Sequence, residues 1–81
     1  PLAVEAAQTR LDAARFAAVT ARQQFERIES LYRDSRGLAS QRDFELALLE
    51  RDRAAAELVR AEAELKRAGV DVRASINNGM A

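Results

Sequence analysis

The chain has 81 residues, and its 13 basic and 13 acidic side chains cancel to a formal net charge of zero. This balance argues against binding to nucleic acid or to an anionic lipid surface, because no net positive charge attracts either polyanion. The chain contains no Cys and no His, which removes disulfides, thiolate chemistry, the usual general base and the commonest zinc ligand. We therefore expect no catalytic residue, no metal site and no cofactor.

The apolar content also limits what the chain can form. Apolar residues make up 48% of the sequence, but nearly half of them are Ala, which leaves little material for a globular core. A composition rich in Ala, Glu, Arg and Leu is typical of long helices and coiled coils. No run of about 18 apolar residues occurs, so we expect no membrane insertion by this segment. The chain begins inside a helical pattern, and we expect it to be an excerpt of a longer protein.

The first predicted helix covers about residues 2–34. Its apolar residues alternate at spacings of three and four, which is the heptad seam of a left-handed coiled coil. Its seam residues are Val4, Ala7, Leu11, Ala14, Ala18, Ala21, Phe25, Ile28 and Tyr32.

A bend is predicted at about residues 35–39, followed by a second helix over about residues 40–68. Gly37 can adopt the positive φ that a bend needs. Ser40, followed by an acid at Asp43, is typical of a helix N-cap with a near capping box. The second helix repeats the alternation of three and four at Phe44, Ala47, Arg51, Ala54, Leu58, Ala61, Leu65 and Ala68.

Folding the chain back at Arg36 keeps the two seams in phase from the bend to the open end. Leu11 then faces Ala61 and Ala14 faces Leu58, so that most layers place a large side chain against Ala and interdigitate without voids. Arg51 breaks the second seam, and we expect it to lie over Ala21 with its charged head turned outward. The sequence therefore predicts an all-α fold, an antiparallel two-helix coiled-coil hairpin over residues 1–69.

The last segment, residues 70–81, departs from this period. Val70-Asp71-Val72-Arg73 alternates like a short strand, and Gly69 follows basic residues as at a helix C-terminus. We expect the tail to be a strand stub or disordered.

Such a hairpin buries few large side chains, and we expect it to need a neighbour. Phe16, Val19 and Leu49 lie off the seam and are candidates for lateral contact. The many carboxylates alternate with Arg at helical spacing, which is typical of a solvated helix face rather than of a catalytic pair.

The run "RIESLYRDSRGLASQRDFELALLERDRAAAEL" resembles the α-hairpin of periplasmic adaptor proteins, also called membrane fusion proteins, of the AcrA/HlyD type. The matching positions are Arg27, Leu31, Tyr32, Gly37, Leu38, Ser40, Asp43, Phe44 and Ala47. The resemblance extends over about residues 2–70, and the interval from Leu31 to Ser40 is longer than in the usual tip of the family.

The resemblance implies a non-enzymatic module of a tripartite efflux or secretion system. The hairpin tip would dock onto a TolC-like outer-membrane channel in the periplasm of a Gram-negative bacterium, and the full-length protein would be anchored to the inner membrane. The implied partners are this channel, neighbouring adaptor copies, and an inner-membrane transporter reached through parts of the protein outside this chain. The implied tip residues are Arg27, Leu31, Arg36, Gly37, Leu38 and Ser40.

Two other functions are compatible with the pattern. A self-associating spacer, in which two hairpins form a four-helix bundle, would use the outward Phe16 and Leu49. A nucleic-acid-binding helical arm would need a net basic face, which the charge balance disfavours.

Overall fold

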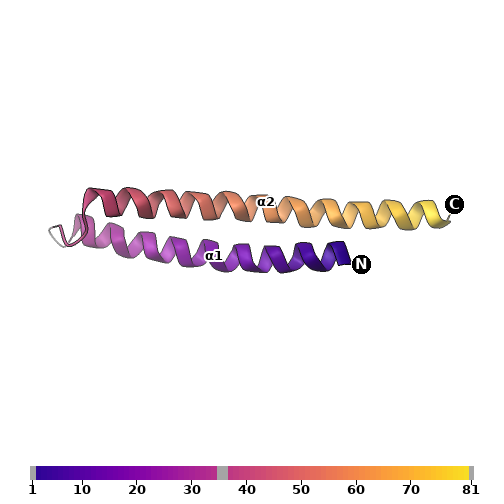
Figure 1. Cartoon of the computed structure of the whole chain (residues 1–81), viewed down its shortest axis with the longest axis horizontal. Coiled ribbons are helices and arrows are strands. Elements are labelled where there is room, and N and C mark those ends of the chain that lie inside the picture. Colours follow the sequence, from indigo (N-terminus) through magenta and orange to yellow (C-terminus); the bar gives the residue numbers. More distant parts are fainter. Residues whose placement is uncertain (1, 35–36, 81) are drawn as a thin grey trace.

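The computed structural model describes the backbone of residues 2–34 and 37–80, and two helices account for nearly all of it. Helix α1 spans Leu2–Arg33 and helix α2 spans Gln41–Met80. They run antiparallel and pack along their length (Figure 1), in a rod of 67 × 14 × 13 Å. The predicted all-α antiparallel hairpin is confirmed.

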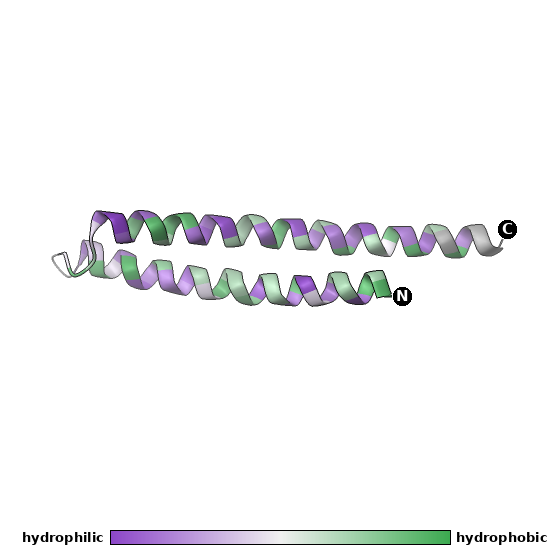
Figure 2. Cartoon of the chain, viewed as in Figure 1, coloured by the Kyte–Doolittle hydropathy of each residue, from purple (hydrophilic) through white to green (hydrophobic). Residues whose placement is uncertain are grey.

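The two helices pack through the predicted seam. Leu11, Ala14 and Ala61 form a buried cluster, and Leu58 and Leu65 pack against it. Phe25 and Ala47 are buried nearer the bend. The core is therefore a single line of small and large side chains between two helices, and Figure 2 shows hydrophobic and hydrophilic residues alternating along both of them.

The predicted end of the second helix is wrong. Residues 70–80 are helical rather than a strand stub or a disordered tail, and residue 81 lies outside the described residues. A lone strand would leave its backbone polar groups without partners, whereas a helix satisfies them internally. Gly69 lies inside the helix, and Gly37 is the one described glycine with a positive φ, at 82°. The helical pattern continues past Gly69 to Val72.

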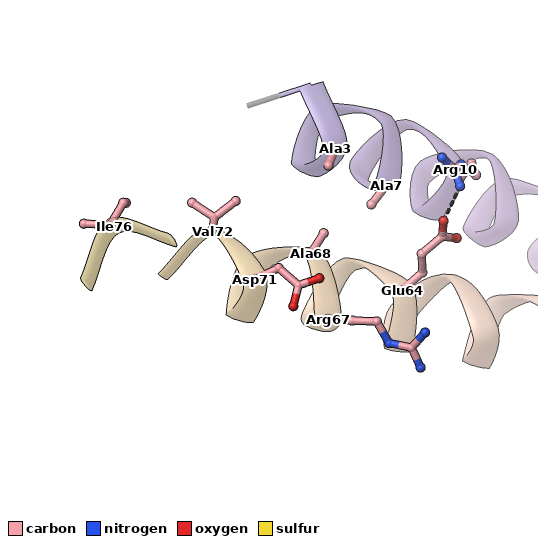
Figure 3. Close-up of a pocket in the computed structure, with 9 residues that line it drawn as sticks. All are labelled: Ala3, Ala7, Arg10, Glu64, Arg67, Ala68, Asp71, Val72 and Ile76. Carbon is pink, nitrogen blue, oxygen red and sulfur yellow. Dashed lines mark hydrogen bonds and ion pairs between the residues drawn. The ribbon is translucent and has the colours of Figure 1, made fainter. Parts of the chain in front are cut away.

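Helix α2 is longer than its partner, with 40 residues against 32 in α1. In the seam register Leu2 lies level with Val70, so about ten residues of α2 extend past the start of α1, a distance of about 15 Å at 1.5 Å per residue. Figure 3 shows Val72 and Ile76 projecting from this extension on the side where α1 lies. A shallow groove at this open end also includes Ala3, Ala7 and the ion pair between Arg10 and Glu64.

None of the described helices combines the length and the apolar character needed to span a membrane.

Candidate functional site

The bend joins the helices through a short loop whose described residues are Asp34 and Gly37–Ser40. The backbone N–H of Asp34 donates to the carbonyl of Ser30 at 2.8 Å, which closes the last turn of α1. Gly37 turns the chain in the left-handed region, which residues with a side chain adopt at a cost. Arg36 was predicted to belong to the tip, and it lies outside the described residues.

A capping box fixes the start of α2. The Ser40 hydroxyl accepts a hydrogen bond from the backbone N–H of Asp43 at 3.0 Å, and the Ser40 backbone N–H donates to Asp43 Oδ2 at 2.9 Å. The backbone N–H of Ser40 and, to a lesser extent, its hydroxyl lower the pKa of Asp43. Desolvation opposes this shift, and the charge of Arg42 adds to it. The predicted N-cap is confirmed.

Three aromatic rings pack the end of α1 against the start of α2, next to the loop. The Phe44 ring lies 5.0 Å from that of Tyr32, nearly parallel to it, and 5.6 Å from that of Phe25. Two guanidinium groups cover the cluster: Arg33 lies 5.2 Å from the Phe44 centroid and Arg51 lies 4.3 Å from the Phe25 centroid. Ring pairs and cation–π contacts of this kind add stabilisation beyond area burial.

The position of Arg51 corrects the sequence prediction. Its guanidinium lies over Phe25 and contacts Asp52 at 3.0 Å, instead of simply extending outward from Ala21. Folding the chain at Arg36 sets Phe44 level with Ile28, whereas the Phe44 ring stacks on Tyr32, one turn further toward the loop. Sequence spacing sets which residues share a layer, but not the direction in which a long side chain points.

The remaining predicted tip residues differ in exposure. Leu38 is 75% exposed and Ala39, beside it, is buried. Arg27 and Leu31 lie one turn apart on α1, where Arg27 is exposed and donates to Gln24, and Leu31 is half-buried. The tip thus presents Leu38, Arg27 and the edge of Leu31 beside a capped helix start.

Sequence reasoning missed Ala39. It occupies the position before the N-cap, and Phe44 occupies the fourth helical position. This is the spacing of a hydrophobic staple, so the signal was present in the sequence.

The three predicted lateral residues do not form one surface. Phe16, 75% exposed, borders a groove with Ala17, Thr20 and Ala21, whereas Val19 lines a different groove with Leu58 and Val59. Leu49 is exposed and lines neither.

In the part of the chain that the structure describes, no group of three or more acidic side chains is arranged to hold a metal ion. No family model, curated protein or solved structure matches the chain.

Proposed function

We propose that this chain is the helical hairpin of a periplasmic adaptor, and that its tip docks onto a TolC-like outer-membrane channel in a tripartite efflux or secretion system. The observation that carries the proposal is the coincidence of the tip-like sequence with one end of a rod. Arg27 and Leu31 lie in the last two turns of α1, and Gly37, Leu38 and Ser40 lie in the loop that follows. The role is mechanical and non-enzymatic.

The shape supports a role in reaching and positioning. A rod 67 Å long and about a fifth as wide places the loop far from the open end. The aromatic cluster around Phe44 holds the end of α1 against the start of α2, and the capping box at Ser40 fixes where α2 begins. A preorganised tip loses less entropy on binding than a flexible one.

The tip offers a small contact area, so one copy should bind weakly. Leu38 is its one large exposed apolar side chain among the described residues 34 and 37–40. Several copies arranged side by side would convert weak contacts into a stable complex through multivalency. Neighbouring adaptor copies are therefore part of the proposal, and the transporter would be contacted through other parts of the protein.

Site-specific crosslinking tests the docking. The chain is fused to a ring-forming scaffold, so that several tips point the same way, and a photoreactive amino acid replaces Leu38. The matched control carries the same group at Glu57, an exposed position in the middle of the shaft. We expect crosslinks to a purified TolC-like channel from position 38 and few from position 57. Equal yields from the two positions, or none from position 38, would reject docking through the tip.

A further inference from the structure

A second heptad seam runs along the outer face of α2, opposite the seam that contacts α1. Its positions again alternate at spacings of three and four: Leu46, Leu49, Arg53, Ala56, Arg60, Ala63, Arg67 and Val70. All eight side chains are exposed. Leu46, Leu49 and Val70 are 46%, 43% and 55% exposed, so a third of the exposed large apolar residues in the described part of the chain lie on this one stripe.

The stripe is self-complementary when a second copy is laid against it in the antiparallel direction. With the two-fold axis level with residue 58, Leu46 faces Val70 of the other copy, Arg53 faces Ala63, and Ala56 faces Arg60. Leu49 faces Arg67, so the stripe has layers of Leu against Val, of Leu against Arg and of Arg against Ala. The seam within the hairpin also sets a long side chain against Ala, but there the long side chain is mostly Leu.

The charges on one flank of the stripe change sign about Val59, one residue from the axis. Glu45 and Asp52 precede Val59, whereas Lys66 and Arg73 follow it at equal distances along the chain. An antiparallel copy therefore places Asp52 opposite Lys66 and Glu45 opposite Arg73. In a parallel copy the two flanks would face each other, which sets Glu45 beside Glu50 and Asp52 beside Glu57 of the other copy, and such like-charge contacts are destabilising.

The acids on the other flank also find partners. Glu50, Glu57 and Glu64 repeat every seven residues, as do Arg53, Arg60 and Arg67. In the antiparallel pair, the three acids lie beside Arg67, Arg60 and Arg53 of the other copy, respectively. Across this flank Glu50 also approaches Glu64 of the other copy, and the two Glu57 side chains approach each other at the axis, so the neighbouring arginines offset like-charge contacts. Within one chain Arg60 already contacts Glu57 at 3.6 Å.

We propose that two copies of this chain associate through the outer face of α2, antiparallel and related by a two-fold axis at the level of residue 58. This association does not depend on channel docking, and it differs from the side-by-side array proposed there, because the tips of an antiparallel pair point in opposite directions. The stripe is about 36 Å long and about 10 Å wide, so the pair buries roughly 700 Å², which is below the 1,200 Å² of a stable dimer. The dimer is therefore transient and depends on concentration and salt.

Cysteine crosslinking tests the orientation, because the chain has no native Cys. The variants Glu45→Cys and Arg73→Cys are mixed and treated with a short bifunctional maleimide. We expect heterodimers of the two variants to exceed homodimers several-fold. An excess of 45–45 and 73–73 homodimers would indicate parallel pairing and overturn the proposal, as would the absence of dimers.

Exchanging the charges of Asp52 and Lys66 tests whether their pairing holds the two copies together. Lys66→Glu should lower the crosslink yield several-fold, and the double variant Asp52→Lys/Lys66→Glu should restore it, because the exchanged pair is again of opposite sign. Arg15→Glu is the control, an exposed charge on α1, and should leave the yield unchanged. Failure of the double variant to recover, or an equal loss with Arg15→Glu, would reject this interface. Circular dichroism confirms that every variant remains helical.

Discussion

At the residue scale, Ser40 and Asp43 determine where α2 begins. The Ser40 backbone N–H and hydroxyl lower the pKa of Asp43, so the folded chain takes up a proton at lower pH than the unfolded chain does. The stabilisation from ionised Asp43 is therefore complete above the ordinary aspartate pKa of about 4. It is lost as pH falls through the lower pKa of the folded state.

Ser40→Ala should lower the free energy of unfolding by about 1 kcal/mol at pH 7, which is typical for loss of an N-cap. The difference in free energy of unfolding between the variant and the unsubstituted chain should narrow as pH falls below about 4, because the Ser40 hydroxyl stabilises only the ionised form of Asp43. Urea denaturation followed by circular dichroism from pH 7 to pH 2 measures both effects. Thr20→Ala, which removes an exposed hydroxyl inside α1, is the control and should change stability little. A constant difference across this pH range would show that the Ser40 hydroxyl does not contribute to lowering the pKa of Asp43.

The residues of the tip could be predicted from the sequence to the extent that local rules determine them. Ser40 as N-cap and Gly37 as the residue with positive φ follow from turn and capping chemistry, and both are confirmed. The exposure of Leu38 beside the buried Ala39 depends on how the loop packs against both helices, which spacing alone does not determine.

At the scale of the element, Gly69 and Gly37 differ in backbone conformation. Gly69 lies inside α2, whereas Gly37 turns the loop at φ 82°. A Cβ added at either position meets no heavy atom within 4 Å, so the backbone alone decides the effect of Ala.

We expect Gly69→Ala to raise the free energy of unfolding by about 0.5–1 kcal/mol, because Ala loses less backbone entropy in a helix. Gly37→Ala should lower it by about 1–2 kcal/mol, because a Cβ disfavours the left-handed region. Thermal and urea denaturation of both variants measure these changes. Destabilisation by Gly69→Ala would show that α2 does not continue through this position.

Gly69 also explains why the prediction for the end of α2 was wrong. Basic residues before Gly69 and the alternation from Val70 to Arg73 are local signals for a stop and a strand. The heptad seam, in contrast, continues from Leu65 and Ala68 to Val72. The longer period was the better guide, because a helix satisfies its backbone without a partner and a strand does not.

At the scale of the whole molecule, the antiparallel register could be predicted because it depends on two long periodic patterns rather than on single residues. The register also places the tip residues at one end of the rod. The register did not predict the aromatic cluster, because the Phe44 ring contacts Phe25 and Tyr32, which lie in the layers on either side of its own.

The unequal lengths of the helices predict unequal local stability along the rod. Near Leu58 and Ala61, α2 packs against Leu11 and Ala14, so opening there requires separating the helices. The extension beyond α1 has no partner helix in this chain, and isolated helical segments of about ten residues are marginal in water. Local opening there costs little.

Hydrogen exchange at low protein concentration should therefore show backbone amides of residues 71–77 exchanging at least about tenfold faster than those of residues 54–65, since a difference of 1.4 kcal/mol in opening free energy already gives that factor. Shortening the chain after Val70 provides the control: it should leave the slow amides near Ala61 unchanged. If residues 71–77 exchange as slowly as the centre of α2 in the monomer, the seam with α1 is not the source of the stability of α2. The extension would then have to be stable by itself.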